Sequence, residues 1–350
     1  MTARELSFVK RCLAPYLFLL AILSINGCAS YSQSRALLQT PPSGLSSIAS
    51  LNNVPFVAQE KYFCGPSAMS MMLQTQGVNL PLESLIGMIY VPERQGSFQV
   101  ELIAAARRVD LVPYVLAPRM ASILQEIDSG NPVLVLQNLG LPSNPVWHYA
   151  VVVGYDLKSK TVTLHSGLEA RKEIAIGTFE RTWANYSESW ALVMLPPNKL
   201  PATATPLGFQ KAIEDLVSIG KSSLAFSAYK SALLKWPEAT HLHTGLGNLY
   251  YQSGDFRMAS ENYSNAISAD PNAANAWNNL AYALAKQGCE NAINAAACAT
   301  KLQPQTDSFS STMSDVQGLL KMHVPTDQVT EAKSCLRLKA CPNSTSEKEP

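Results

Sequence analysis

Three prolines recur at a nearly constant period in the second half of the chain. Pro237, Pro271 and Pro304 are 34 and 33 residues apart. A period of this length is typical of a solenoid, in which each repeat is a pair of helices that buries its apolar face against the next pair. Proline ends the second helix of a pair because it lacks the N–H that a helix interior needs. The period therefore predicts stacked helix pairs.

The residues between these prolines resemble a tetratricopeptide repeat. Small residues at fixed places let neighbouring helices approach closely. The residues that fit the pattern before Pro271 are Gly247, Tyr250, Gly254, Ala259, Tyr263 and Ala266. The repeats on either side are less regular, as terminal repeats tend to be. We predict three repeats over residues 206–304, which would dock a protein partner.

The chain after the repeats is expected to close the solenoid. We predict a closing helical segment over residues 305–341, with a helix from 325 to 340 that turns Val329, Ala332 and Leu336 inward. The final residues, 342–350, are polar and are predicted to be disordered.

The first 27 residues have the features of an export signal. Arg4, Lys10 and Arg11 precede an apolar run that is too short to span a bilayer comfortably and contains Pro15. The stretch that ends in Gly27 and Cys28 resembles the lipobox of bacterial lipoproteins, which implies that Cys28 is diacylated and becomes the mature N-terminus. The alternative is a plain secretory signal with an incidental cysteine.

Lipidation at Cys28 would decide the location of the protein. A lipid anchor implies attachment to a membrane of the bacterial cell envelope, facing the periplasm. Ala29, rather than aspartate, follows the cysteine, and by resemblance to Gram-negative lipoproteins this favours the outer membrane. We expect residues 28–50, which are rich in Ser, Gln and Pro, to form a flexible tether.

Residues 51–197 are expected to form one α+β domain. A helical pattern near its start is followed by β-branched runs of strand length at 133–136, 150–153, 162–164 and 190–195. A Pro-rich linker at residues 198–205 then separates this domain from the repeats.

Composition excludes several classes of function. The chain has 27 basic and 26 acidic residues, and only 15% of its residues are charged, so no surface for nucleic acid is indicated. No spacing typical of a metal site, a phosphate-binding loop or a dinucleotide-binding motif occurs, and we expect no metal and no cofactor. Peptides and proteins remain as the expected substrates and partners.

The sequence around Cys64 has the features of a nucleophile. Gly65, Pro66 and the small residues after them predict a helix that begins at the cysteine, because proline is favoured in the first turn. At a helix N-terminus the free N–H groups stabilise a thiolate, so we expect a lowered pKa for Cys64. Gln59 is placed to donate to the oxyanion of a tetrahedral intermediate, together with the Cys64 N–H.

His148 is the predicted general base. It begins a β-branched run, so its ring would lie at the end of a strand and could reach a helix terminus. Of the other histidines, His241, His243 and His323 lie in or beyond the repeats, and we expect His165 to be structural or to face substrate.

These motifs resemble the bacteriocin-processing peptidases, papain-like enzymes that remove double-glycine leaders. The matching pieces are Gln59, the stretch from Cys64 to Ala68 and the stretch from His148 to Asp156. The resemblance covers residues 51–197 and implies a papain-like fold with Cys64 and His148 as its catalytic pair.

One position departs from that family. Ser166 occupies the place of the acid that orients the histidine. Either Ser166 hydrogen-bonds the imidazole without a charge, or Asn138 orients it, or the enzyme is weakened. Asp156 is not expected to contact His148, because eight residues along a strand span more than about 20 Å.

Two functions therefore compete. The first is a cysteine peptidase or amide hydrolase that acts through a Cys64 thioester on a peptide or protein of the cell envelope, with acyl transfer to an amine as a variant. The second is a catalytically weakened peptidase-like protein that docks peptides or partners through its repeats. Retention of both Cys64 and His148 favours the first, and Ser166 favours the second.

Of the seven cysteines, Cys12 would leave with the export signal, and the four after Cys64 predict disulfides, since an exported chain meets an oxidising compartment. Nine residues of helix separate Cys289 from Cys298 by about 13 Å, and a disulfide needs Cα atoms within about 7 Å. These two cysteines therefore cannot pair with each other. We predict that Cys289 or Cys298 pairs with Cys335 or Cys341.

Overall fold

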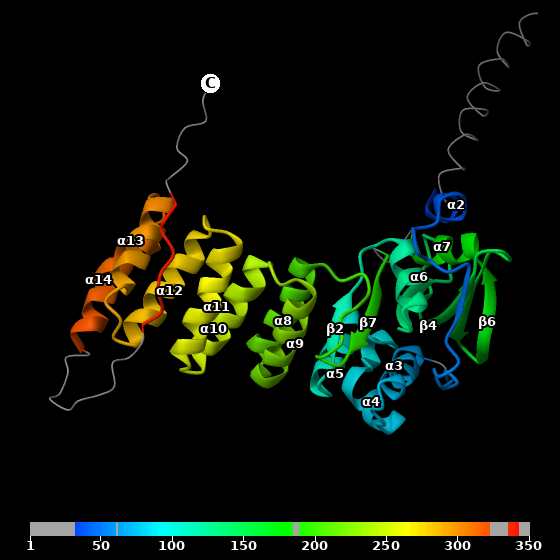
Figure 1. Cartoon of the computed structure of the whole chain (residues 1–350). Helices are drawn as coiled ribbons and strands as arrows, with labels where there is room; N and C mark the ends of the chain where they lie inside the picture. The colour runs from blue at the N-terminus through cyan, green and yellow to red at the C-terminus, as the bar shows by residue number, and fades with distance from the viewer. Residues whose placement is uncertain (1–31, 61, 185–188, 323–334, 343–350) are drawn as a thin grey trace, which may run out of the picture. The chain divides into compact units, whose positions relative to one another are not determined.

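A computed structural model describes residues 32–60, 62–184, 189–322 and 335–342 (Figure 1). The chain divides into two compact units. The first contains the chain up to residue 106 together with residues 115–194 and 201–203, and the second contains residues 107–114, 195–200 and those from 204 onward. Among the described residues, none of the helices has both the length and the apolar character that a bilayer crossing requires.

An antiparallel sheet forms the centre of the first unit, and the α+β expectation is confirmed. Its strand order is β2-β7-β3-β4-β5-β6, with β1 also paired to β4. The strands are β1 (Ile48–Ser50), β2 (Val112–Val115), β3 (Val133–Asn138), β4 (Trp147–Asp156), β5 (Thr161–Ser166), β6 (Glu169–Ala175) and β7 (Ala191–Leu195). The four β-branched runs of the sequence lie in or beside β3, β4, β5 and β7.

Helices cover this sheet and contribute most of the remaining core. Helices α3, α6 and α7 pack on β3 and β4 or on their neighbours, and every residue of β3 is buried between layers. The helices of this unit are α2 (Ser32–Gln39), α3 (Cys64–Thr75), α4 (Leu82–Ile89), α5 (Gln99–Arg108), α6 (Met120–Asp128) and α7 (Ile176–Ala184), with a 3₁₀ turn η2 (Pro92–Arg94). Burial on both sides explains why these strands are continuous apolar runs.

The predicted flexible tether is wrong for residues 32–39 and 48–50. Residues 32–39 form helix α2, whose first N–H groups, at Gln33 and Ser34, donate to the Glu180 carboxylate at 2.9 and 2.8 Å. Strand β1 pairs with β4. The partner that orders this segment lies almost 150 residues away, so local composition did not indicate it. Residues 1–31, with Cys28 and the export signal, lie outside the described part of the chain.

The second unit is helical, as the repeat period predicts. Helices α8 to α13 form three antiparallel pairs, and α14 packs on α12 and α13. A Cβ atom at Gly247 would lie 2.5 Å from the Tyr263 ring, so only glycine permits this approach of α10 to α11. The bounds are α8 (Pro206–Ser218), α9 (Ser222–Lys235), α10 (Thr240–Gln252), α11 (Phe256–Ala269), α12 (Ala274–Lys286), α13 (Ala292–Leu302) and α14 (Asp307–Met322).

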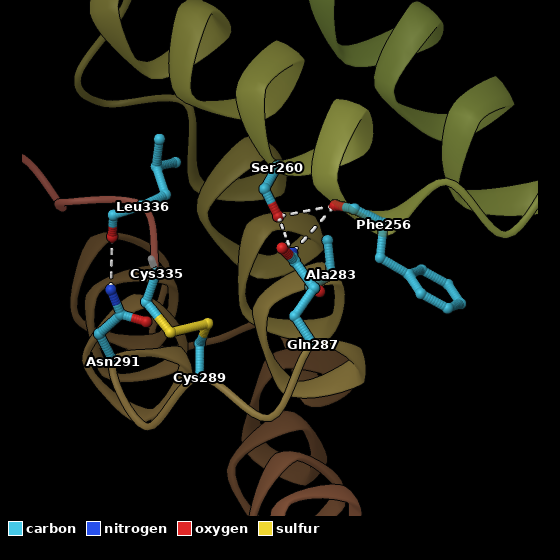
Figure 2. The surroundings of a disulfide bond; sticks show 8 residues. All are labelled: Phe256, Ser260, Ala283, Gln287, Cys289, Asn291, Cys335 and Leu336. Atoms are coloured by element: carbon cyan, nitrogen blue, oxygen red, sulfur yellow. Dashed lines mark hydrogen bonds between the residues drawn. A yellow bond between two sulfur atoms is a disulfide. The ribbon is translucent and has the colours of Figure 1, made fainter. Parts of the chain in front are cut away.

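Both predicted disulfides link the third helix pair to the C-terminal segment. Cys289 pairs with Cys335, and Cys298 pairs with Cys341. Figure 2 shows the first disulfide, beside which the Asn291 side chain donates to the Leu336 carbonyl oxygen at 2.6 Å. The prediction that Cys289 and Cys298 do not pair with each other is confirmed, but its premise is wrong, because Cys289 precedes α13 and no unbroken helix joins the two cysteines.

The predicted closing helix is wrong for residues 335–340. Residues 335–342 have no regular secondary structure, and residues 323–334, with Val329 and Ala332, lie outside the described part. The segment is held instead by its two disulfides, Cys335 to Cys289 and Cys341 to Cys298, and by the hydrogen bond from the Asn291 side chain to the Leu336 carbonyl oxygen.

Loss of the second disulfide should destabilise the repeats. Replacing Cys298 and Cys341 together with serine removes a cross-link between residues 43 positions apart. The chain-entropy relation gives a loss of about 4 kcal/mol in unfolding free energy. Urea unfolding followed by circular dichroism measures it, with Cys64→Ser as the control that removes a thiol but no cross-link. An unchanged midpoint in the double variant would contradict the prediction.

Candidate active site

Helix α3 begins at Cys64, as the sequence predicts. Phe63 precedes it without a side-chain cap, and Pro66 lies in the first turn. Because no side chain caps this end, the first N–H groups remain available to a ligand. The backbone N–H groups of Tyr149, Gly65 and Cys64 itself all act on the thiol. Cys64 is the one free cysteine among the described residues.

The pKa of the Cys64 thiol is raised, contrary to the prediction of a lowered value. Burial is the largest influence and disfavours the thiolate, while the N–H groups of Tyr149, Gly65 and Cys64 favour it more weakly. The sequence indicated the helix terminus but not the depth at which it is buried. At neutral pH Cys64 is therefore present as the thiol.

His148 is the second residue of β4 and hydrogen-bonds Ser166. Its Nε2 lies 3.0 Å from Ser166 Oγ at the end of β5. Of the alternatives that the sequence left open, this contact fits the one in which Ser166 hydrogen-bonds the imidazole, and its catalytic role stays a prediction. Burial, and to a smaller extent the charge of Lys172, lowers the pKa of His148. The imidazole is accordingly neutral at neutral pH.

Tyr149 places the Cys64 thiol beside the strand that bears His148. Its backbone N–H faces the Cys64 thiol, and His148 is the residue immediately before it. Burial and then the charge of Cys64 raise the pKa of the Tyr149 phenol, so it stays protonated. The structure therefore brings the helix terminus of Cys64 to the beginning of β4, where the sequence analysis expected the base.

Gln59 joins the same strand to the turn after Ser166. Its side-chain amide donates to the Tyr149 carbonyl oxygen at 3.2 Å and accepts from the Gly167 N–H at 2.8 Å, and its own N–H donates to the Gly167 carbonyl oxygen. Gln59 is buried. One amide hydrogen is left for a ligand, so its oxyanion role stays a prediction.

The other residues that the sequence analysis considered make contacts away from the Cys64 thiol and the His148 imidazole. Asn138 accepts from the N–H groups of Gly140 and Val146, both at 2.9 Å, and shapes the β3–β4 connection rather than orienting His148. His165 is structural: Nδ1 accepts from the Arg171 N–H, which leaves Nε2 to donate to the Val54 carbonyl oxygen. Asp156 receives the Lys158 N–H at the far end of β4.

Three neighbours of the site were not singled out from the sequence, although Tyr149 lies in the matching stretch from His148 to Asp156. Tyr149 and Lys172 act through the contacts given above, and Ser97 accepts a hydrogen bond from the Tyr149 phenol at 3.2 Å through its carbonyl oxygen. All three reach the site through tertiary packing. Within the described part of the chain, no cluster of His, Cys, Asp and Glu is arranged to hold a metal ion.

Comparison with known families agrees with this geometry. Residues 51–191 match the model of the Peptidase_C39 like family. This region is a C39-like peptidase domain. Residues 247–288 match the model of the TPR repeat, so the helical unit contains a tetratricopeptide repeat. No curated protein is significantly similar to the chain.

Solved structures resemble each part separately. A C39-like peptidase from Bacillus anthracis is 18% identical, with a TM-score of 0.37 over 42% of this chain and 97% of that one. A double glycine motif protease from an AMS/PCAT transporter, in complex with a leader peptide, is 21% identical, with a TM-score of 0.32 over 42% and 98%. The second TPR domain of human RPAP3, in complex with an HSP70 peptide, is 14% identical, with a TM-score of 0.30 over 32% and 94%.

Alkylation of Cys64 in the C39-like domain should require alkaline pH. Because burial raises its pKa above the ordinary value of 9.0, the thiolate fraction is small at pH 6 and grows as the pH rises. We expect slow labelling by iodoacetamide at pH 6 and a continuous increase up to pH 10, measured by mass spectrometry of the Cys64 peptide. Free glutathione is the control for an exposed thiol. Faster labelling of Cys64 than of glutathione at pH 6 would contradict the raised pKa.

Proposed function

We propose that the C39-like domain is a cysteine peptidase, with Cys64 as nucleophile and His148 as general base. The observation that supports this most is the position of a free cysteine at an uncapped helix terminus, beside the main chain of the strand that bears His148. The other described cysteines are joined in disulfides and lie in the helical unit.

The proposed reaction starts from a neutral pair. Burial raises the pKa of Cys64 and lowers that of His148, so thiol and imidazole coexist uncharged. As the sulfur attacks the peptide carbonyl carbon, the thiol proton passes to His148, and the carbonyl oxygen becomes an oxyanion. The Cys64 N–H and the remaining amide hydrogen of Gln59 would donate to this oxyanion.

Breakdown of the intermediate completes the cycle. The C–N bond breaks, His148 returns its proton to the leaving amine, and a thioester remains on Cys64. His148 then takes a proton from water as the water oxygen attacks the thioester, and the thiol leaves with that proton. Ser166 would orient the His148 imidazole through its hydrogen bond with Nε2. If an amine rather than water attacked the thioester, the enzyme would be an acyl transferase.

The proposed biological setting follows from the whole chain. The substrate would be a peptide or protein of the cell envelope, reached by a domain anchored through lipid on Cys28. The tetratricopeptide repeats would dock a protein partner. Mass spectrometry of the mature N-terminal peptide tests the anchor: a diacylated Cys28 is expected, and an unmodified N-terminus at another residue would contradict it.

One observation favours the alternative, a weakened peptidase-like binding protein. The group that contacts His148 is the neutral hydroxyl of Ser166, whereas a carboxylate would stabilise the imidazolium that forms during attack. A binding protein would retain peptide affinity without turnover, so the measurement that separates the two functions is hydrolysis itself.

A peptide library tests the proposed activity. The wild-type chain is expected to cleave a subset of a proteome-derived peptide mixture, and mass spectrometry of new termini identifies the cleavage sites. Cys64→Ala should abolish cleavage without lowering the melting temperature, because the thiol is small and lies at a helix end. Cleavage by Cys64→Ala would contradict the nucleophile. Absence of cleavage by the wild type would favour the binding protein.

Ser166→Asp should raise the rate at neutral pH by about tenfold, because a carboxylate stabilises the imidazolium of the transition state. The same charge raises the pKa of His148. Since the base must be neutral, the acidic limb of the pH–rate profile should move to higher pH. Ser166→Ala is the matched control, with a lower rate and no such movement. An acidic limb that stays in place in Ser166→Asp would show that residue 166 does not act on His148.

A further inference from the structure

A short strap crosses the beginning of helix α3. The strap, residues 91–98, is closed by a bridge between Val91 and Gly96, with the Val91 N–H donating to the Gly96 carbonyl oxygen at 2.8 Å. The turn inside it is η2, and Gln95, the residue that follows it, has a φ of +48°. Arg94 lies over the Phe98 ring at 5.0 Å. These contacts hold the end of the strap at one place.

Ser97 of the strap packs directly on the residue after the nucleophile. A Cβ atom at Gly65 would lie 2.5 Å from Ser97 Oγ and 2.8 Å from Ser97 Cβ, so only glycine leaves room. The Ser97 carbonyl oxygen accepts from the Tyr149 phenol. Ser97 therefore lies against Gly65 and Tyr149, two of the three residues whose N–H groups face the Cys64 thiol.

The Ser97 hydroxyl has no hydrogen-bond partner among the described residues, although its oxygen is buried. A buried polar group without a partner costs about 1–3 kcal/mol. Nearby buried serines on α3 do not share this state: Ser67 Oγ donates to the Ala58 carbonyl oxygen, and Ser70 Oγ accepts from the Gln74 amide. Ser97 therefore differs from both of these serines in having an unpaired hydroxyl.

We propose that Ser97 is a substrate-binding residue whose hydroxyl donates a hydrogen bond to a main-chain carbonyl oxygen of the peptide. The neighbouring groups decide the polarity, because the N–H groups of Cys64, Gly65 and Tyr149 are all donors and attract an acceptor to this place. The inference rests on the proposed peptidase function, and it adds a third side chain to Gln59 and His148 around the peptide.

The test measures alkylation of Cys64 rather than turnover. Two probes are compared on the full-length chain: iodoacetamide, which makes no main-chain contacts, and a pool of tripeptidyl chloromethyl ketones. In Ser97→Ala the rate with iodoacetamide should stay within twofold of wild type, while the rate with the peptidyl reagents should fall about threefold to tenfold, the value of one hydrogen bond. The melting temperature should not fall, since the substitution removes an unpaired hydroxyl.

Ser70→Ala is the matched control, because it removes a buried serine hydroxyl of α3 that is paired. It should lower the melting temperature and leave both alkylation rates unchanged. An equal change with both probes in Ser97→Ala, or no change with either, would overturn the proposal. So would a wild-type chain that reacts no faster with any peptidyl reagent than with chloroacetone. Because alkylation needs no turnover, a chain that fails to hydrolyse peptides still gives an interpretable result for Ser97.

Discussion

The position of Tyr149 in β4 is the constraint on which the candidate site depends. Its N–H faces the Cys64 thiol, its carbonyl oxygen accepts from Gln59 and its phenol donates to Ser97, so one residue meets the helix terminus, the oxyanion candidate and the strap. Pairing of β4 with β3 and β5 sets this position, because a slip of one residue would exchange the two faces of the strand. The sheet thereby determines where the strand that bears His148 lies relative to Cys64.

Burial then determines the chemistry that this arrangement can perform. The same exclusion of water raises the pKa of Cys64 and lowers that of His148, and Lys172 adds to the second effect. A thiolate–imidazolium pair would need a compensating charge, which the hydroxyl of Ser166 does not supply. The departure at Ser166 and the neutral resting pair are therefore two aspects of one electrostatic arrangement, and in the reaction that we propose the proton would be transferred during attack.

Local patterns predicted the elements that short-range chemistry determines. Pro66 and Gly65 indicated the start of α3 because the first helical turn selects such residues, and the β-branched runs indicated strands because both of their sides are buried. Gly247 was predicted to allow close helix packing for the same kind of reason. The failures at α2 and at residues 335–340 have the opposite origin. Glu180 and the two disulfides act from far along the chain, and they override composition and helical periodicity.

The amino-acid sequence by itself determined the α+β and repeat architecture and the candidate pair of Cys64 and His148, since periodicity and helix geometry are local properties. Only the tertiary structure decided that Ser166 contacts His148, that burial outweighs the helix terminus at Cys64, and that an unpaired Ser97 hydroxyl lies against Gly65. These outcomes depend on which side chains exclude water from a given atom. That is a property of contacts between distant segments, which no local pattern records.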